Sequence, residues 1–204
     1  MPPSSPPDDH PIRPGHPLAL GLIGRLKPRS RILDFCTGSG RNAAALAAAG
    51  YDVVRFDDAA AQRNDPLPRV PGGFAAVVST HGLLHGTARE IAELAGSLAN
   101  VLACDGLFVA AFGSAADARF GQGLRLSRQT FAPADGDERG VAHTYFTRAE
   151  LEAILAKHLV IESLEEVAVD SIAGTWAHAG RPLENAVHWF LVARRPAEGT
   201  VTDQ

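Results

Sequence analysis

The sequence contains few cysteines, and it lacks the long apolar or basic runs that mark several classes of protein. Cys36 and Cys104 are its two cysteines in 204 residues, too few for a disulfide framework or a cysteine-based metal site. No run of about 18 apolar residues is present, and the first residues show no basic stretch followed by an apolar one. We therefore expect a cytoplasmic protein without a membrane partner.

Lysine and arginine form no block anywhere in the chain, and the formal net charge is −4. A basic surface that binds nucleic acid is therefore not expected. The remaining composition, with 46% apolar and 21% charged residues, is typical of a globular enzyme. Its length fits one domain.

Proline marks the ends of this domain. Seven of the 14 prolines fall in residues 1–17, which we expect to form a flexible arm because proline fixes the backbone and donates no hydrogen bond. Residues 18–196 are expected to form the domain. Residues 197–204, a polar stretch after Pro196, are expected to be a flexible tail.

The most informative segment is residues 31–58. Apolar residues at 31–35 predict a buried strand, and a turn containing Gly38 and Gly40 follows it. Residues 41–49 are strong helix formers that end before a glycine, and residues 51–56 predict a second strand. Two acids, Asp57 and Asp58, close the segment. This order is how an α/β protein holds an adenosine, with the acid meeting the ribose hydroxyls.

Two nucleoside cofactors fit this pattern. Gly38, Gly40 and Ala43 satisfy the G-x-G-x-x-A fingerprint of dinucleotide binding, so an NAD-dependent oxidoreductase is one alternative. Asp34, at the end of the first strand, favours the other, because a carboxylate repels a pyrophosphate but attracts the ammonium and sulfonium groups of S-adenosylmethionine. An ordinary strand, turn and helix without a ligand is the third interpretation.

The stretch Ile-Leu-Asp34-Phe-Cys-Thr-Gly38-Ser-Gly40-Arg-Asn resembles the first motif of the class I S-adenosylmethionine-dependent methyltransferases. Residues 74–81 and 105–113 are similar to the family's fourth and fifth strands, and residues 140–151 resemble small bacterial members of the type 11/12 or tellurite-resistance sort. The resemblance implies S-adenosylmethionine as cofactor. It implies that the cofactor is held by Asp34, Cys36, Thr37, Gly38, Gly40, Asn42, Asp57, Asp58 and Thr80.

The chain departs from the family in two places. Cys36 stands where the family often has glycine, which reduces the backbone freedom of the turn. Residues 58–73 are too few for the helix, third strand and second helix that the family fits there. We therefore predict an α/β, Rossmann-like, mostly parallel sheet with helices on both faces. It has six strands in the family order 2-1-4-5-7-6, strand three missing or vestigial, and the last strand antiparallel.

Methyl transfer from a sulfonium is an in-line displacement that needs alignment and exclusion of water but no obligatory base. His81 and His143 are the candidate catalytic residues, followed by His85 and Tyr145. A metal is not expected: Gly82 disfavours one helix carrying His81 and His85, and the sequence near them offers no carboxylate.

Residues 114–146 and 171–186 are expected to cover a small-molecule substrate, because they follow strands at the carboxyl edge of the sheet. The enzyme is expected to be a monomer or a homodimer. The alternative function is a catalytically silent methyltransferase-like module that binds or regulates, which the shortened strand-three region and Cys36 favour.

Overall fold

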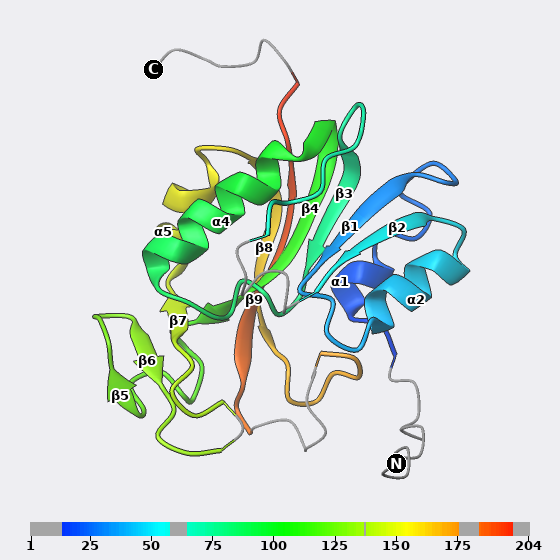
Figure 1. The fold of residues 1–204 in the computed structure, drawn as a ribbon. Helices are drawn as coiled ribbons and strands as arrows, with labels where there is room; N and C mark the ends of the chain where they lie inside the picture. The colour runs from blue at the N-terminus through cyan, green and yellow to red at the C-terminus, as the bar shows by residue number, and fades with distance from the viewer. Residues whose placement is uncertain (1–13, 58–64, 137, 176–183, 198–204) are drawn as a thin grey trace, which may run out of the picture.

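The computed structural model describes residues 14–57, 65–136, 138–175 and 184–197. A mixed sheet with helices on both faces forms the body of the molecule (Figure 1). In chain order its elements are α1 (Pro17–Leu20), β1 (Arg31–Phe35), α2 (Arg41–Ala48), β2 (Asp52–Phe56), β3 (Phe74–Ser79), α4 (Ala88–Asn100), β4 (Leu102–Ser114), β5 (Leu124–Arg125), β6 (Thr130–Ala132), β7 (His143–Phe146), α5 (Arg148–Leu155), β8 (Val160–Ala168) and β9 (Val187–Arg194).

Six of these strands form the main sheet in the order β2-β1-β3-β4-β9-β8. The pairs among β2, β1, β3 and β4 are parallel, and β9 runs antiparallel to both β4 and β8. This is the order predicted from the sequence, with the last strand antiparallel as expected. Residues 65–73, the described part of the link between β2 and β3, contain no strand.

The predicted count of six strands is wrong, because the described residues form nine. The three additional strands, β5, β6 and β7, lie in residues 114–146, where the sequence indicated no strand. They pair in the order β5-β6-β7, and β7 joins the end of β4 in parallel at Gly113 and Ser114. Short strands such as β5 and β6 carry too few residues for alternation of apolar and polar side chains to reveal them.

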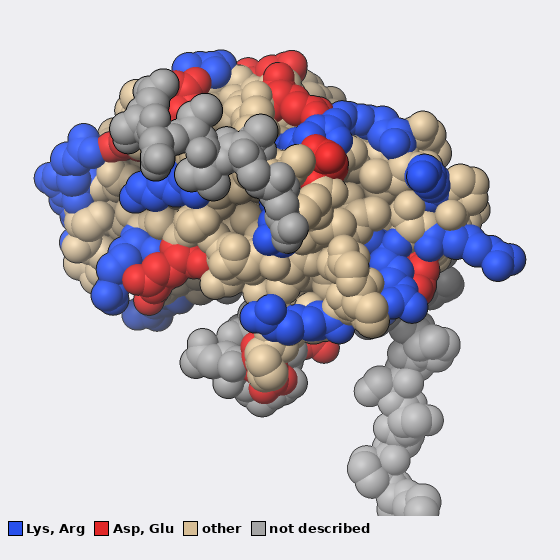
Figure 2. Space-filling model, turned by 90° about the horizontal axis from the view of Figure 1, so that it is seen from above, with Lys and Arg blue, Asp and Glu red and all other residues tan. Residues whose placement is uncertain are grey.

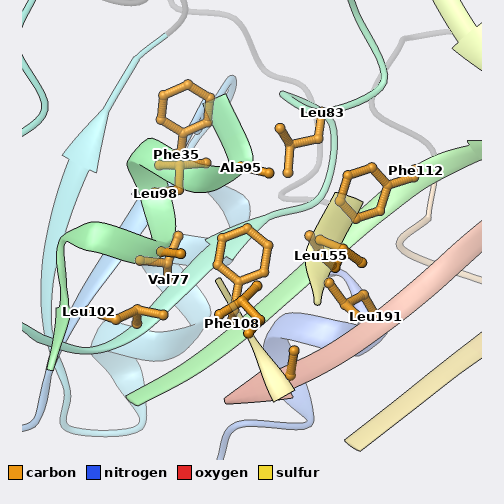
Figure 3. Packing of buried hydrophobic residues seen from close by; sticks show 14 of the residues in the cluster. Phe35, Val77, Leu83, Ala95, Leu98, Leu102, Phe108, Phe112, Leu155 and Leu191 are labelled. Atoms are coloured by element: carbon orange, nitrogen blue, oxygen red, sulfur yellow. The ribbon is translucent and has the colours of Figure 1, made fainter. Parts of the chain in front are cut away.

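Strand residues alternate between two apolar clusters, one on each face of the sheet. On β1, Leu33 and Phe35 join the cluster that packs under α4 and α5 (Figure 3). Ile32 points to the opposite face and joins Ala19 and Leu46 beneath α1 and α2. Fully buried aromatic side chains, Phe74, Phe108, Phe112 and Phe146, fill the larger cluster. Each face therefore has its own core, and this double burial keeps the carboxyl ends of β1 and β3 side by side.

Helices α4 and α5 each begin at a Thr-x-x-Glu sequence, residues 87–90 and 147–150, which is the signature of a capping box. Thr87 and Glu90 form a reciprocal capping box at the start of α4, as Thr147 and Glu150 do for α5. At the N-terminal end, the expected flexible arm at 1–17 is described only from Pro14 onward. There Pro17 begins α1, and the His16 side chain is fully buried and caps that helix.

No described helix is both long enough and apolar enough to cross a membrane. On the face seen in Figure 2, lysine and arginine side chains lie in separate groups among acidic and uncharged ones.

Candidate active site

The turn between β1 and α2 depends on left-handed backbone. Gly38 and Gly40 have φ angles of 50° and 78°, and the N–H of Gly40 donates to the carbonyl of Thr37 over 2.8 Å. Cys36 also has a positive φ, 52°. A side chain in this conformation costs about 1–2 kcal/mol relative to glycine, so the departure from the family at Cys36 is a strained position.

Asp34 caps the helix that follows this turn. Its Oδ2 accepts hydrogen bonds from the Thr37 hydroxyl at 2.7 Å and from the backbone N–H of Ala43 at 3.1 Å. Gly40, the N-cap residue of α2, supplies no side chain for that role. A protein carboxylate thus already occupies the helix N-terminus, where a pyrophosphate would otherwise bind.

Burial is the main influence on Asp34, whose exposed fraction is 1%, and it raises the pKa of the carboxyl group. Hydrogen bonds from Thr37 and Ala43 and the positive charge of Arg55 act in the opposite direction. Arg55 is the register partner of Asp34 on β2, and its guanidinium packs on Gly40, 2.9 Å from where a Cβ would stand. The guanidinium of Arg55 therefore lies directly against the glycine turn.

The residues expected to hold the cofactor divide into a buried frame and an exposed surface. Asp34, Thr37, Asn42 and Thr80 are buried, so their side chains build the frame of the turn. Gly38 is exposed, and so is Asp57, which directly follows β2. Asp58 lies outside the described residues.

A chain of hydrogen bonds joins this frame to the end of β3. Asn42 accepts from the backbone N–H of His16 at 2.8 Å and donates to the Thr80 hydroxyl at 3.0 Å. Thr80 lies 3.1 Å from Nδ1 of His81, and Nε2 of His81 lies 3.2 Å from the Thr175 carbonyl. A carbonyl only accepts, so Nε2 carries the proton and Nδ1 accepts from Thr80. Both ring nitrogens of His81 are therefore engaged.

Beyond this chain of hydrogen bonds lies a small hollow that is partly open to solvent. It is lined by His81, Leu84, His85, Gly113, Arg119, Glu138, His143, Thr144, Tyr145 and His188. The structure thus brings both candidate catalytic histidines, and both residues ranked after them, into one cavity. None of the described residues expected to hold the cofactor belongs to this lining.

His81, His143 and His188 are neutral near pH 7. Burial lowers the pKa of His81 to about 3 and the pKa values of His143 and His188 to about 4. Burial likewise raises the pKa of Tyr145 to about 12. These three histidines therefore present uncharged imidazoles to the hollow, and Tyr145 presents an uncharged phenol.

Arg119 places a positive charge in the lining of the hollow. Its guanidinium donates to both carboxylate oxygens of Asp117, at 2.8 and 3.0 Å, and its Nη2 lies 3.4 Å from Nε2 of His188. Asp117 also accepts from the backbone N–H of Val187 at 2.8 Å, which ties the segment after β4 to the start of β9.

Sequence reasoning missed Arg119, Glu138 and His188. Arg119 and Glu138 lie in the segment expected to cover the substrate, but no motif singled them out. His188 lies inside an apolar strand pattern, where a single histidine predicts nothing beyond the strand. Trp176 and His178, which fall within the second expected cover, lie outside the described residues.

No protein-family model and no curated protein matches this chain. Solved structures do match its fold. A methyltransferase of the S-adenosylmethionine-dependent kind from Methanosarcina mazei is 15% identical, covers 91% of this chain and all of its own, and gives a TM-score of 0.67. The 1,6-didemethyltoxoflavin-N1-methyltransferase of Burkholderia thailandensis, with bound 1,6-didemethyltoxoflavin and S-adenosylhomocysteine, is 18% identical over 88% of this chain and 77% of its own, with a TM-score of 0.60.

A third similar structure carries a different activity. The [4+2]-cyclase SpnF is 17% identical, covers 88% of this chain and 80% of its own, and gives a TM-score of 0.58. The chain thus has the fold of the class I S-adenosylmethionine-dependent methyltransferases, and this fold also hosts other chemistry.

Proposed function

We propose that this chain is a methyltransferase that uses S-adenosylmethionine to methylate a small-molecule acceptor. The observation that carries the proposal is the cap made by Asp34 on α2. It places a carboxylate at the one point of the glycine turn where a dinucleotide needs an anion site, and a cationic donor is compatible with it.

The residues at the turn fit such a donor. Gly38 offers exposed backbone, and Asp57 projects from the end of β2, where the ribose hydroxyls of an adenosine are expected. When bound, the donor supplies an electrophilic methyl group. The chain's own part is to hold the donor at the turn and to present the acceptor from the adjoining hollow with water excluded.

The two candidate catalytic histidines receive different roles. Nε2 of His143 is buried and has no hydrogen-bond partner in the described part of the chain, so we assign to His143 the contact with the acceptor. His81 has both ring nitrogens engaged, so we assign it the positioning of the frame at the end of β3. The hydrogen bonds from His81 through Thr80 to Asn42 connect the hollow, where we propose that the acceptor binds, to α2.

Donor binding by Asp57→Ala tests the proposal, with Asp52→Ala as the matched control at the other end of β2. Loss of hydrogen bonds to the ribose should weaken the affinity for S-adenosylmethionine about tenfold or more, while the control keeps it. Calorimetry measures both. If the unaltered chain is stabilised against heat by NADH and not by S-adenosylmethionine or S-adenosylhomocysteine, the proposal is wrong.

A second candidate function is a silent module that binds the donor without transferring its methyl group. Arg55 favours it, because its guanidinium packs on Gly40 at the turn that a donor must approach. Incubation with methyl-labelled donor and a metabolite extract separates the two. Label in a new product supports the enzyme, and donor binding without any labelled product supports the module.

A further inference from the structure

Three side chains of the hollow, those of His85, Glu138 and His143, bring atoms that can bind a metal ion close together. Nε2 of His85 lies 3.4 Å from Oε1 of Glu138, and Nε2 of His143 lies 3.4 Å from Oε2 of the same carboxylate. One ligand-type atom from each of the three residues lies within 4.8 Å of the other two. The carboxylate thus stands between two imidazole nitrogens, at the same distance from each.

The backbone fixes the two histidines opposite each other. His85 and His143 form an antiparallel β-bridge, flanked by a hydrogen bond from the N–H of Gly86 to the carbonyl of Ala142 at 2.7 Å. The hydroxyl of Thr144 donates to the carbonyl of Gly86, also over 2.7 Å. Cross-strand neighbours of this kind present their side chains on one face, and here the two rings lie 4.8 Å apart and nearly perpendicular.

Glu138 comes from a turn that is closed on itself. The N–H of Val141 donates to the carbonyl of Glu138, and the N–H of Gly140 donates to the carbonyl of Pro133, each over 2.9 Å. The turn leads directly into β7, which carries His143. Glu138 is therefore held near the bridge by a short, hydrogen-bonded path.

The two nitrogen–oxygen separations are longer than those of hydrogen-bonded ion pairs. A carboxylate bonded to a protonated imidazole lies about 2.7–2.9 Å away, and neither nitrogen is that close. Nitrogen and oxygen ligands about 2.0–2.1 Å from a tetrahedral zinc ion are about 3.3–3.4 Å from each other, which matches these two separations. Nε2 of His143 is also buried without a hydrogen-bond partner among the described residues, on a side chain with an exposed fraction of 8%.

We propose that His85, Glu138 and His143 bind a divalent cation of the zinc class, with a remaining coordination position open to the hollow. Two imidazoles favour Zn²⁺, Fe²⁺, Co²⁺ or Ni²⁺ over Mg²⁺ and Ca²⁺, which prefer oxygen ligands. Three protein ligands with one open position are typical of a catalytic rather than a structural site. All three residues line the hollow with Arg119 and Tyr145, so the open position takes water or an oxygen atom of a bound molecule.

This proposal replaces the expectation of no metal. That expectation rested on the run from Thr80 to His85, which offers two histidines but no carboxylate. The third ligand comes from Glu138 and the second histidine from His143, both far along the chain. With a cation bound, the acceptor would contact the cation, and His143 would hold the cation instead of contacting the acceptor itself.

Metal binding by the purified full chain tests this without any methyl donor. After removal of metal with a chelator, Zn²⁺ is titrated against a chromophoric competitor, and Co²⁺ is added separately to record its visible d–d absorption. We expect one equivalent per chain and a tetrahedral Co²⁺ spectrum. Glu138→Gln and His85→Ala should each weaken Zn²⁺ binding at least about tenfold and abolish that spectrum.

The matched control is His158→Ala, which removes an exposed histidine that lies just after α5 and outside the hollow. It should leave affinity and spectrum unchanged. Far-ultraviolet circular dichroism checks that the variants fold, and Glu138→Gln keeps the shape of its side chain. Absence of stoichiometric binding by the unaltered chain overturns the proposal, and so does binding that survives both Glu138→Gln and His85→Ala.

Discussion

Oδ2 of Asp34 accepts a hydrogen bond from the backbone N–H of Ala43 at 3.1 Å, across the whole glycine turn. The carboxylate at the end of β1 thus caps α2, and it does so from a site with an exposed fraction of 1%. Two effects are combined in this contact. The hydrogen bonds stabilise the turn, and under the function proposed above the carboxylate also determines which cofactors the turn accepts.

Asp34→Asn separates these two effects. Asparagine keeps an acceptor oxygen but no charge, and burial already raises the pKa of Asp34, which favours the neutral form. We therefore expect the free energy of unfolding to fall by only about 1 kcal/mol, against about 2–3 kcal/mol for Asp34→Ala, which loses both bonds. Urea denaturation measures this. Calorimetry should show weaker binding of S-adenosylmethionine to Asp34→Asn, and unchanged affinity would contradict the electrostatic argument.

Gly113 and Gly38 should differ in their response to alanine. A Cβ on Gly113 would lie 2.6 Å from the carbonyl oxygen of Thr144, on the strand that β4 pairs with, whereas a Cβ on Gly38 meets nothing within 4 Å. Gly38→Ala should cost about 1 kcal/mol from its φ of 50° alone. Gly113→Ala should cost more than about 2 kcal/mol, because backbone must move. If the two variants lost the same free energy of unfolding in urea denaturation, this would show that β7 shifts readily to make room for the added Cβ.

Cys36 offers a test of backbone strain. Its φ of 52° suits glycine, so Cys36→Gly should raise the free energy of unfolding by about 0.5 kcal/mol, the relief of strain less the entropy cost of glycine. Cys36→Val should lower it by about 1 kcal/mol or more, because a β-branched side chain tolerates this conformation poorly. The contrast between the two variants in urea denaturation is the measurement. A valine variant as stable as the glycine variant would mean that the turn relaxes.

The sequence predicted the fold best where local signals agree with one another. The bounds of β1 match the predicted strand, and the two Thr-x-x-Glu sequences form the capping boxes that such sequences predict. The small number of residues between 58 and 73 also predicted that the third strand would be missing, and residues 65–73 contain none. In each case the information lies within one short segment of the chain.

The candidate site was less accessible because its contacts are long-range. His81 and His143 could be singled out by position, but the convergence of Glu138 on His85 and His143 depends on the β-bridge between the loop that carries His85 and the start of β7. Similarly, nothing local indicates that Arg119 reaches His188 on β9. The catalytic roles of His81 and His143 and the role of Asp58 stay predictions, and the Asp57→Ala experiment tests the role of Asp57.

The ion pair of Asp117 and Arg119 supports the wall of the hollow and should make stability depend on pH. Burial raises the pKa of Asp117, but it is outweighed by hydrogen bonds from Arg119 and from the backbone N–H groups of Arg119 and Val187, which hold the pKa below its usual range. A carboxyl group with a lowered pKa in the folded state stabilises the protein above its unfolded pKa of about 3.9. That contribution disappears as the pH falls through the folded-state value.

Asp117→Asn should therefore cost about 2 kcal/mol of unfolding free energy at pH 7, because it leaves the partly buried guanidinium of Arg119 without its counter-charge. The difference between the unaltered chain and this variant should shrink below about pH 4, as Asp117 itself becomes protonated. Asp52→Asn is the matched control: its pair with Arg31 is exposed on both sides, so its cost should stay within about 0.5 kcal/mol. Urea denaturation at several pH values between 3 and 7 measures both variants, and a difference for Asp117→Asn that stays constant over that range would show that the carboxylate charge does not stabilise the wall.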